Sequence, residues 1–419
     1  MERVVVVGAG LAGLRTVVGL REQGYAGELT LVGAESRGPY DRPPLSKAIL
    51  SGKSDDSALP FDPDELRVDF RPGVRATRLR GDVVETAGPG EVSGPDLDFD
   101  GLVLATGAEP VVLPGEGARY LRTHDDAHAL RAALRPGAAV VIVGAGWIGA
   151  EVATVARTVG CRVTVVEQAP TPVAHALPPQ VGRHLAPWYA EAGADLLLDH
   201  RVAAVGPNTV DFADGTTLRA DVVIVGVGVR PATGWLADSG LELDRGVVVG
   251  ADLAAGRRGV YAVGDVAARW SPRYGARVRG EHWDDALRAP AVAVANLLGG
   301  AQTYDPVPYV WSEQFGRMVQ YAGLPAAGLP ASTPAAGPPG AEPDVPGTQL
   351  VWRGDPAADD RWSVFWLDQD ARVAAVLAVD QPRDFVAGRR IAESGAAVDP
   401  ALLADPAVSV KSSVAGSAG

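Results

Sequence analysis

The pattern of apolar positions repeats itself along the chain. Residues 4–13 read VVVVGAGLAG, and residues 140–149 read VVIVGAGWIG. A run of four β-branched residues predicts a buried strand, and the glycine turn after it predicts a tight connection to a helix. Further strands predicted over residues 28–32 and 162–166 complete a strand–helix–strand unit in each copy. The repeat therefore predicts two nucleotide-binding folds in tandem.

Later apolar runs divide the rest of the α/β chain. A strand at 259–265 is expected to complete the first fold, which would then span residues 1–110 and 240–316. The second fold is expected over residues 111–239. A small α/β C-terminal domain is expected over residues 317–419, with strands at 349–352, 362–366 and 372–379 and a helix at 382–392. The Pro-, Ala- and Gly-rich segment 323–347 predicts an exposed insertion within it.

Composition and charge exclude several classes of protein. With 419 residues, of which 47% are hydrophobic and 21% charged, the chain is expected to form two or three globular domains. No apolar run is long enough for a membrane span, and the N-terminus lacks a signal peptide, so a cytoplasmic protein is expected. A formal net charge of −13 argues against nucleic acid as a partner. The single cysteine, Cys161, excludes an intramolecular disulfide and a cysteine-ligated cluster.

The glycines of the two turns carry the nucleotide prediction. In each turn the first glycine turns the chain, the second lets backbone N–H groups approach a pyrophosphate, and the third seats the helix on the strand. These positions are Gly8, Gly10 and Gly13 in the first copy, and Gly144, Gly146 and Gly149 in the second.

A carboxylate after the second strand of such a fold accepts bonds from ribose hydroxyls and repels a 2′-phosphate. Glu167 follows Val166 directly, and this position favours NADH over NADPH in the second fold. In the first fold the candidate is Glu35, which lies two positions further along, so a surface glutamate remains an alternative there. The six histidines show no ligand spacing, and no metal site is expected.

Residues 39–47 read PYDRPPLSK, and this segment resembles the signature of one particular protein family. Together with the motifs at 105–107, 144–151, 261–265, 281–283, 311–314 and 353–356, this segment resembles the oxygenase-coupled, NADH-dependent ferredoxin reductases. That family has a glutathione reductase-like fold with FAD, NAD and C-terminal domains. The resemblance implies FAD and NAD as cofactors and a ferredoxin as partner, which feeds a P450 or a ring-hydroxylating oxygenase. A monomer or weak homodimer is expected.

The resemblance also implies roles for individual residues. Lys47 matches a lysine at the reactive edge of the flavin, and Glu151 matches a glutamate that faces it when nicotinamide arrives. The pair is expected to act in catalysis by tuning the protonation of flavin N5. Lys47 is also one of only three lysines in the chain. The remaining matched cofactor-binding positions are Arg42, Pro43, Ala105, Thr106, Gly107, Gly228, Asp265, Trp283 and Trp311.

Four features depart from the family pattern, and one of them is the unexpected length of the insertion over residues 323–347. Val111 and Val112 stand near a position where the family often has arginine, and Glu313 stands where aspartate is usual. Pro290 is expected to interrupt the helix that follows Trp283. Partner choice is therefore open, and two alternatives remain. One is an NADH oxidase or another small-acceptor reductase on the same fold, and the other is an NADH-sensing flavoprotein that resembles apoptosis-inducing factor.

Overall fold

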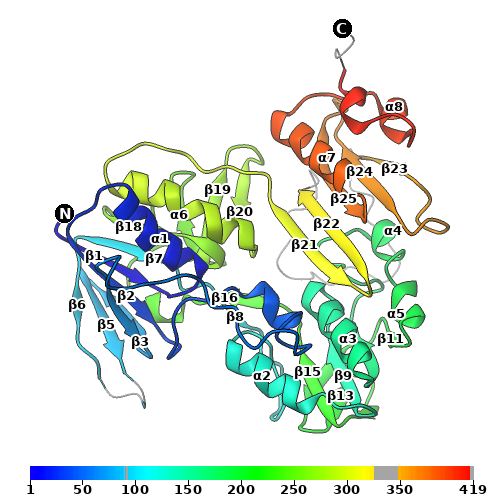
Figure 1. Ribbon diagram of the computed structural model, residues 1–419, viewed down its shortest axis with the longest axis horizontal. Helices are drawn as coiled ribbons and strands as arrows, with labels where there is room; N and C mark the ends of the chain where they lie inside the picture. Colours follow the sequence, from blue (N-terminus) through cyan, green and yellow to red (C-terminus); the bar gives the residue numbers. More distant parts are fainter. Residues whose placement is uncertain (89, 91–92, 325–347, 416–419) are drawn as a thin grey trace. The chain divides into compact units, whose positions relative to one another are not determined.

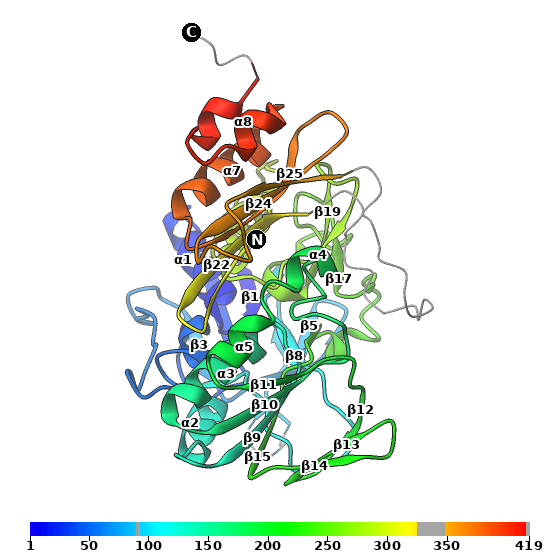
Figure 2. The same ribbon diagram turned by 90° about the vertical axis from the view of Figure 1, so that its right-hand side faces the viewer.

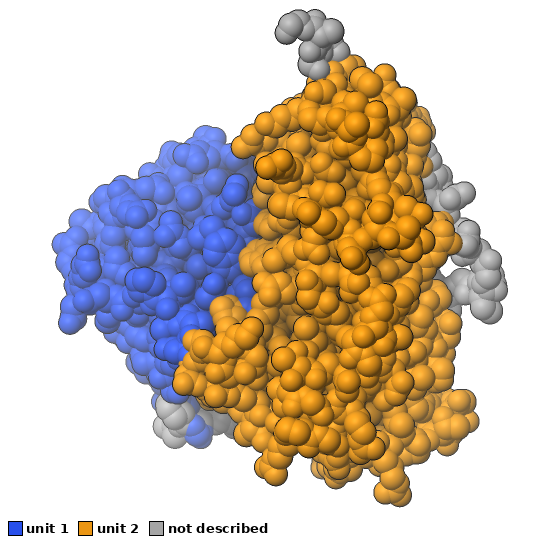
Figure 3. Space-filling model, turned by 45° about the vertical axis from the view of Figure 1, so that its right-hand side comes forward, with its two compact units in different colours: residues 1–43, 56–109, 229–306 blue, residues 44–55, 110–228, 307–419 orange. Residues whose placement is uncertain are grey.

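The computed structural model describes residues 1–88, 90, 93–324 and 348–415. Contacts between Cα atoms divide the chain into two compact units, which Figure 3 shows in different colours. Unit 1 comprises residues 1–43, 56–109 and 229–306, and unit 2 comprises residues 44–55, 110–228 and 307–419. The short stretch 44–55 thus belongs to unit 2, although the chain on both sides of it belongs to unit 1.

A parallel five-stranded sheet forms the centre of unit 1, in the order β18-β7-β1-β2-β3 (Figure 1). Its strands are β1 (Arg3–Val7), β2 (Glu28–Gly33), β3 (Asp69–Pro72), β7 (Gly101–Leu104) and β18 (Val260–Ala262). All neighbouring strands run parallel. Strands β1 and β7 are buried almost throughout, as expected for a parallel sheet covered on both faces. The first predicted nucleotide fold is confirmed.

Two helices of unit 1 pack closely against each other. They are α1 (Leu11–Glu22) and α6 (Trp283–Leu297). A Cβ atom added at Gly19 in α1 would lie 3.7 Å from Val294 in α6, so the two backbones approach closely. The expected interruption at Pro290 is wrong, because α6 runs through this residue. Pro290 and its neighbour Ala289 are buried, and we attribute the continuous helix to this packing, which offsets the hydrogen bond that proline cannot donate.

Smaller elements complete unit 1. Two three-stranded sheets have the orders β4-β5-β6 and β17-β19-β20, and β8 pairs with β16. Their bounds are β4 (Arg75–Arg80), β5 (Val83–Ala87), β6 (Leu97–Asp98), β8 (Ala108–Pro110), β16 (Val229–Pro231), β17 (Val247–Val249), β19 (Ala267–Ser271) and β20 (Ala276–Val278). The short 3₁₀ helices of unit 1 are η3 (Gly234–Leu236) and η4 (Gly264–Val266), whereas η1 (Pro43–Ser46) lies in unit 2 from its second residue on.

Unit 2 contains a second parallel sheet, in the order β11-β10-β9-β15. Its strands are β9 (Ala139–Val143), β10 (Arg162–Val166), β11 (Asp195–Leu197) and β15 (Val222–Val225). The helices of this part are α2 (His124–Ala133), α3 (Trp147–Val159), α4 (Pro179–Gly182) and α5 (Pro187–Glu191). An antiparallel sheet of β12 (Val202–Val205), β13 (Thr209–Phe212) and β14 (Thr217–Arg219) follows them along the chain. The second predicted nucleotide fold is confirmed.

The C-terminal part of unit 2 is an antiparallel sheet in the order β21-β22-β25-β24-β23, with α7 packed on it (Figure 2). Its elements are β21 (Tyr309–Gln314), β22 (Arg317–Gly323), β23 (Gln349–Arg353), β24 (Trp362–Leu367), β25 (Val373–Val379), α7 (Pro382–Ser394), α8 (Pro400–Ala404) and η5 (Val410–Ser413). The β21–β22 hairpin straddles the expected domain limit at 316/317, and the domain limits stay a prediction. Residues 325–347 of the expected insertion lie outside the described residues.

A buried arginine holds the end of this part together. Arg353 donates to the carboxylate of Asp384 at 3.0 Å and to the carbonyl oxygens of Leu403 and Asp405 at 2.6 and 2.7 Å. A fixed guanidinium fork can satisfy several acceptors at once, and this explains an arginine at the first position of the 353–356 motif. None of the helices in the described ranges has the length and apolar character that a membrane span requires.

Candidate nucleotide and redox site

The first glycine turn of unit 1 leaves no room for side chains. A Cβ atom at Gly8 would lie 2.2 Å from the carbonyl oxygen of Ala105, and one at Gly13 would lie 1.8 Å from the carbonyl oxygen of Gly8. Gly10 is the N-cap residue of α1, and no described side chain caps the helix there. The N–H groups of the first turn of α1 are therefore available to an anion, and this fits a dinucleotide pyrophosphate.

Arg42 and Glu35 lie beside this turn. Arg42 Nη1 is 2.9 Å from the position that a Cβ atom of Gly10 would take. Arg42 Nη2 donates to Glu35 Oε1 at 2.9 Å, and the hydroxyl of Tyr40 donates to Glu35 Oε2 at 2.7 Å. Arg42 Nε is buried and has no hydrogen-bond partner within the described part of the chain. A buried donor without an acceptor beside an open helix N-terminus fits a bound nucleotide.

The motif Ala105-Thr106-Gly107 follows strand β7 at the same edge of the sheet. Thr106 Oγ1 donates to the carbonyl oxygen of Ala232 at 3.0 Å, and the N–H of Ala232 donates to the carbonyl oxygen of Gly107 at 2.9 Å. Gly107 has a φ of +68°, which favours glycine. The motif is thus fixed where the carboxyl ends of β1 and β7 place a ligand.

The indole of Trp283 is tied to the 39–47 signature. Its Nε1 donates to Asp41 Oδ1 at 2.6 Å, so the first residue of α6 and the segment before η1 share a hydrogen bond. Burial raises the pKa of Asp41, while the bond from Trp283 acts in the opposite direction. The sequence motif gave no role to Asp41, which positions the expected flavin-contacting Trp283. Pro43 then begins η1.

Asp265 follows β18 in the short helix η4, directly after Gly264 with a φ of +69°. Burial raises the pKa of Asp285 to about 6, and the negative charge of Asp265 adds to this rise. The structure thus brings two carboxylates, one expected and one missed, to the same part of unit 1.

The second glycine turn, in unit 2, repeats the backbone of the first. A Cβ atom at Gly144 would lie 2.4 Å from the carbonyl oxygen of Gly226, and one at Gly149 would lie 2.0 Å from that of Gly144. Gly146 is the N-cap residue of α3, again with no described side chain as a cap. Gly228 has a φ of +112°, and a Cβ atom there would meet nothing described within 4 Å. This open cradle fits a second nucleotide.

The carboxylate of Glu167 lies at this turn, as the sequence predicts. Its Oε2 accepts from the N–H of Ala145 at 2.8 Å, and its Oε1 accepts from the N–H of Ala169 at 2.9 Å. The imidazole of His175 lies on the other side, with Cε1 3.4 Å from where a Cβ atom of Gly146 would be. No sequence motif marks His175, because the loop that carries it folds back over the turn.

Lys47 and Glu151 form an ion pair in unit 2. Lys47 Nζ lies 2.7 Å from Glu151 Oε2, and the exposed fractions of the two side chains are 21% and 3%. Ser46 Oγ donates to the same carboxylate oxygen, and Ser312 Oγ donates to Glu151 Oε1 at 2.7 Å. A buried carboxylate that keeps its charge needs such donors. The arrangement holds one positive and one negative charge in a largely dry environment.

The C-terminal sheet supplies the outer part of this network. Ser312 lies on β21, next to the expected cofactor residue Trp311, and its Oγ accepts from Gln314 Nε2 at 3.2 Å. The ring of Trp311 stacks on Tyr309 with centroids 5.6 Å apart. The 311–314 motif indicated that this strand belongs to the site. It could not indicate that Ser312 contacts Glu151, because the two residues are 161 positions apart in the sequence.

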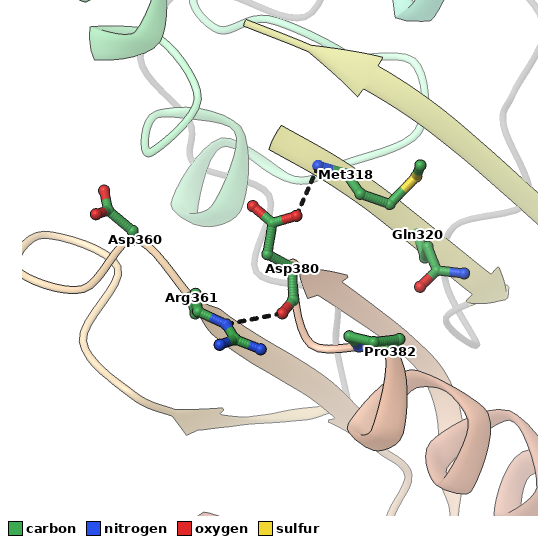
Figure 4. A pocket seen from close by; sticks show the side chains of 6 residues that line it. All are labelled: Met318, Gln320, Asp360, Arg361, Asp380 and Pro382. Carbon is green, nitrogen blue, oxygen red and sulfur yellow. Dashed lines mark hydrogen bonds between the residues drawn. The ribbon is translucent and has the colours of Figure 1, made fainter. Parts of the chain in front are cut away.

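A pocket in the C-terminal part is separate from these residues (Figure 4). Its centre is Asp380, which accepts from the N–H of Met318 at 3.0 Å through Oδ1 and from Arg361 Nε at 3.0 Å through its carbonyl oxygen. Met318, Gln320, Asp360, Arg361, Asp380 and Pro382 line it. None of these six is a predicted site residue, and the pocket adds nothing to the nucleotide sites.

Comparison with known proteins agrees with this geometry. Residues 2–289 match the family described as pyridine nucleotide-disulphide oxidoreductase, and residues 344–414 match the family described as reductase C-terminal. The chain belongs to the pyridine nucleotide-disulphide oxidoreductase family. The disulphide in this description has no counterpart here, since the single cysteine Cys161 is free and buried.

Individual members of the family align with nearly the whole chain. The ferredoxin–NAD(+) reductase component of the anthranilate 1,2-dioxygenase system of Burkholderia cepacia is 37% identical and covers 97% of this chain and 98% of its own. The crystal structure of Fdr9 has a TM-score of 0.87 at 45% identity, and the match covers 98% of this chain and 99% of Fdr9. A chain of the crystal structure of the covalent putidaredoxin reductase–putidaredoxin complex gives a TM-score of 0.87 at 31% identity. The match covers 98% of this chain and 97% of that one. The resemblance inferred from the sequence is confirmed.

Proposed function

We propose that this protein is an NADH-dependent flavoprotein reductase that transfers electrons through FAD to a [2Fe–2S] or similar ferredoxin. The observation that carries the proposal is the pair of glycine cradles, each at a helix N-terminus that no described side chain caps, in a chain with one buried cysteine. A dithiol acceptor within the chain is impossible, so the electrons must leave to another molecule. The relatives named ferredoxin–NAD(+) reductase components support a ferredoxin as that molecule.

The cofactors are FAD and NAD(H). We assign FAD to the turn of unit 1 with Glu35, Arg42 and Asp265, and NADH to the turn of unit 2 with Glu167. Bound FAD supplies a centre that takes two electrons as hydride and releases them singly. The N–H groups of α1 and α3 hold pyrophosphates, since a helix N-terminus favours an anion. Each turn and its acidic residue thus orient one dinucleotide.

Lys47 and Glu151 are the catalytic pair in this proposal. The Lys47 ammonium supplies a positive charge and a proton donor, and the Glu151 carboxylate fixes the position of that ammonium through the 2.7 Å contact. Ser46 and Ser312 hold the carboxylate in turn, so its orientation does not depend on solvent. Trp283, fixed by Asp41, and Trp311, stacked on Tyr309, offer aromatic surfaces that exclude water.

Several wider features belong to the same proposal. The FAD domain spans residues 1–110 and 240–316, the NAD domain spans 111–239, and the C-terminal domain spans 317–419. The ferredoxin serves a P450 or a ring-hydroxylating oxygenase. One relative is named as part of an anthranilate 1,2-dioxygenase system, and a solved structure is named as the ferredoxin reductase for the CYP199A2 system. Glu167 makes the enzyme prefer NADH to NADPH. The protein acts in the cytoplasm as a monomer or weak homodimer.

One experiment separates the proposal from its alternatives. FAD-loaded protein is mixed with NADH under anaerobic conditions, with and without a [2Fe–2S] ferredoxin, and again in air. The proposal expects rapid ferredoxin reduction and slow oxygen consumption. Rapid oxygen consumption with no ferredoxin reduction would instead identify an oxidase. A long-lived reduced complex that dimerises with NADH and reduces no carrier would identify an NADH-sensing protein.

A further inference from the structure

Two histidines of α2 converge with a backbone carbonyl, away from the residues assigned to cofactors. His124 and His128 are four residues apart on one helix, so they lie on the same face. Their Nε2 atoms are 3.3 Å apart. Both also face the carbonyl oxygen of Asp55, at 3.2 Å from His124 and 3.1 Å from His128. The three polar atoms form a nearly equilateral triangle.

Hydrogen bonds alone cannot satisfy all three edges of this triangle. A ring nitrogen either carries a proton or offers a lone pair, and a carbonyl oxygen only accepts. If both Nε2 atoms are protonated, two donors face each other at 3.3 Å. If either lacks its proton, that nitrogen and the Asp55 oxygen face each other as two acceptors. Every tautomer leaves at least one edge between like groups, whereas a cation at the centre would use three lone pairs at once.

The size of the triangle matches a metal ion. Zn²⁺ binds imidazole nitrogen at about 2.0–2.1 Å in a tetrahedral arrangement, which places neighbouring ligand atoms about 3.3 Å apart. The observed edges are 3.1, 3.2 and 3.3 Å. The Asp55 carboxylate is 83% exposed and pairs with Arg131 Nη1 at 2.6 Å, so it can turn toward a bound cation. It or a water molecule would take the fourth position.

We propose that His124, His128 and Asp55 bind one divalent transition-metal ion of the Zn²⁺ type. Imidazole ligands suit Zn²⁺, Ni²⁺ and Cu²⁺, and they suit Mg²⁺ and Ca²⁺ poorly. Within the described residues no cluster of three or more His, Cys, Asp or Glu side chains is arranged as metal ligands, so the main-chain carbonyl is an essential part of this site. The sequence predicted no metal site, because the four-residue spacing of His124 and His128 places them together only once the helix is known.

A bound ion would act on the stretch that carries Lys47. Asp55 ends the stretch 44–55, which belongs to the same unit as α2. At the other end of this stretch, Ser46 and Lys47 hold the carboxylate of Glu151. Cross-linking Asp55 to α2 restrains the stretch at both ends. The site thus offers a structural clamp on the segment that positions Lys47.

Untagged, FAD-loaded protein is first freed of metal with a chelator and dialysed. It is then titrated with ZnCl₂ to test the proposal. Isothermal calorimetry is expected to show one ion per chain. His128 is partly exposed, so His128→Asn should fold, and it is expected to lower the association constant by more than about 100-fold, since even indirect partners of a metal ligand matter 10–100-fold. The matched control is His200→Asn, because the Nδ1 of His200 contacts the carbonyl oxygen of Leu198 and not a second histidine, and this variant should bind as the parent does.

Co²⁺ gives an independent spectroscopic measurement. The parent and His200→Asn are expected to show the visible absorption of imidazole-bound Co²⁺, and His124→Asn and His128→Asn are expected to lack it. Flavin absorbance and melting temperature in chelator confirm that each variant is folded. Binding that is equal in the parent and in His128→Asn would overturn the proposal, and so would the absence of any Zn²⁺ binding by the parent.

Discussion

The two glycine turns have nearly the same backbone and different surroundings. A Cβ atom at the third glycine would lie 1.8 Å from a carbonyl oxygen in the first turn and 2.0 Å in the second. Around the first turn, side chains hold the acidic residue, since Arg42 and Tyr40 donate to Glu35. Around the second, backbone N–H groups hold Glu167. We therefore expect the turn to provide the dinucleotide cradle and its neighbours to decide which dinucleotide binds.

The largest expected effect comes from filling each turn with one methyl group. Gly13→Ala is expected to abolish FAD retention, because the Cβ atom would overlap the carbonyl oxygen of Gly8. Gly149→Ala should keep FAD and weaken NADH binding by more than about 100-fold, the equivalent of about 3 kcal/mol. The measurements are flavin absorbance per chain and NADH titration. Gly19→Ala, in the same helix as Gly13, is the control that should bind both, because a Cβ atom there would make only an ordinary van der Waals contact with Val294, at 3.7 Å.

The proposed function requires one hydride transfer between the two nucleotides, and the next variant tests Lys47, which we propose as a catalytic residue. Lys47→Ala is expected to slow flavin bleaching by NADH by about tenfold or more, since the loss of about 1.4 kcal/mol of transition-state stabilisation has that effect. Stopped-flow absorbance measures the rate. The exposed Lys53, six residues further along the same stretch, provides the control Lys53→Ala, which should react as the parent does. Equal rates for the two variants would remove Lys47 from catalysis.

The acidic residues test the difference between the turns directly. Glu167→Ala is expected to weaken NADH use by about fivefold, the equivalent of roughly 1 kcal/mol for a lost hydrogen bond, and to narrow the gap with NADPH. Glu35→Ala should leave the NADH/NADPH ratio unchanged and make FAD dissociate faster. Steady-state kcat/KM with both nucleotides is the measurement. A ratio that Glu35→Ala changes as much as Glu167→Ala would contradict the assignment of one nucleotide to each turn.

The last expected effect concerns stability and a partly buried acid of unit 1. Burial raises the pKa of Asp285 from 3.8 to about 6. The charge of Arg269 opposes this rise, and the charges of Asp265 and Asp284 add to it. A raised pKa stabilises the fold below the ordinary pKa of the carboxyl, and this stability is lost as the pH rises through about 6. Above about pH 6, Asp285→Asn should therefore raise the free energy of unfolding relative to the parent by up to about 3 kcal/mol, since each pKa unit corresponds to about 1.4 kcal/mol. The difference in melting temperature should vanish toward about pH 4.

The parts that could be predicted from sequence are those fixed by local pattern. Runs such as residues 140–143 form parallel strands because every position is buried, and the glycines follow them because no Cβ atom fits. Glu167 was found because its place after β10 follows from the fold. The helix interruption expected at Pro290 is wrong, because the expectation rested on local sequence alone. A local propensity was outweighed by packing that involves residues far away in the sequence.

The rest of the candidate site depends on contacts between distant segments. Ser312 reaches Glu151 across 161 residues, and Trp283 reaches Asp41 across 242. The Lys47–Glu151 pair was expected only from the family resemblance, and no spacing rule joins residues 104 positions apart. His175 was missed because the loop over the second turn has no regular pattern. Such contacts appear only when the fold has placed their elements.

The central claim is that the two turns hold FAD and NADH and that no sulfur of this chain carries electrons. Its most direct test is an anaerobic count of electrons in a Cys161→Ala variant loaded with FAD. Limiting NADH is added to excess [2Fe–2S] ferredoxin, and the bleaching of the iron–sulfur absorbance is measured. Two ferredoxins reduced per NADH, at the parental rate, is the predicted result. A flavin-loaded variant that leaves the ferredoxin oxidised while the parent reduces it, or a parent that binds no FAD, would contradict the account.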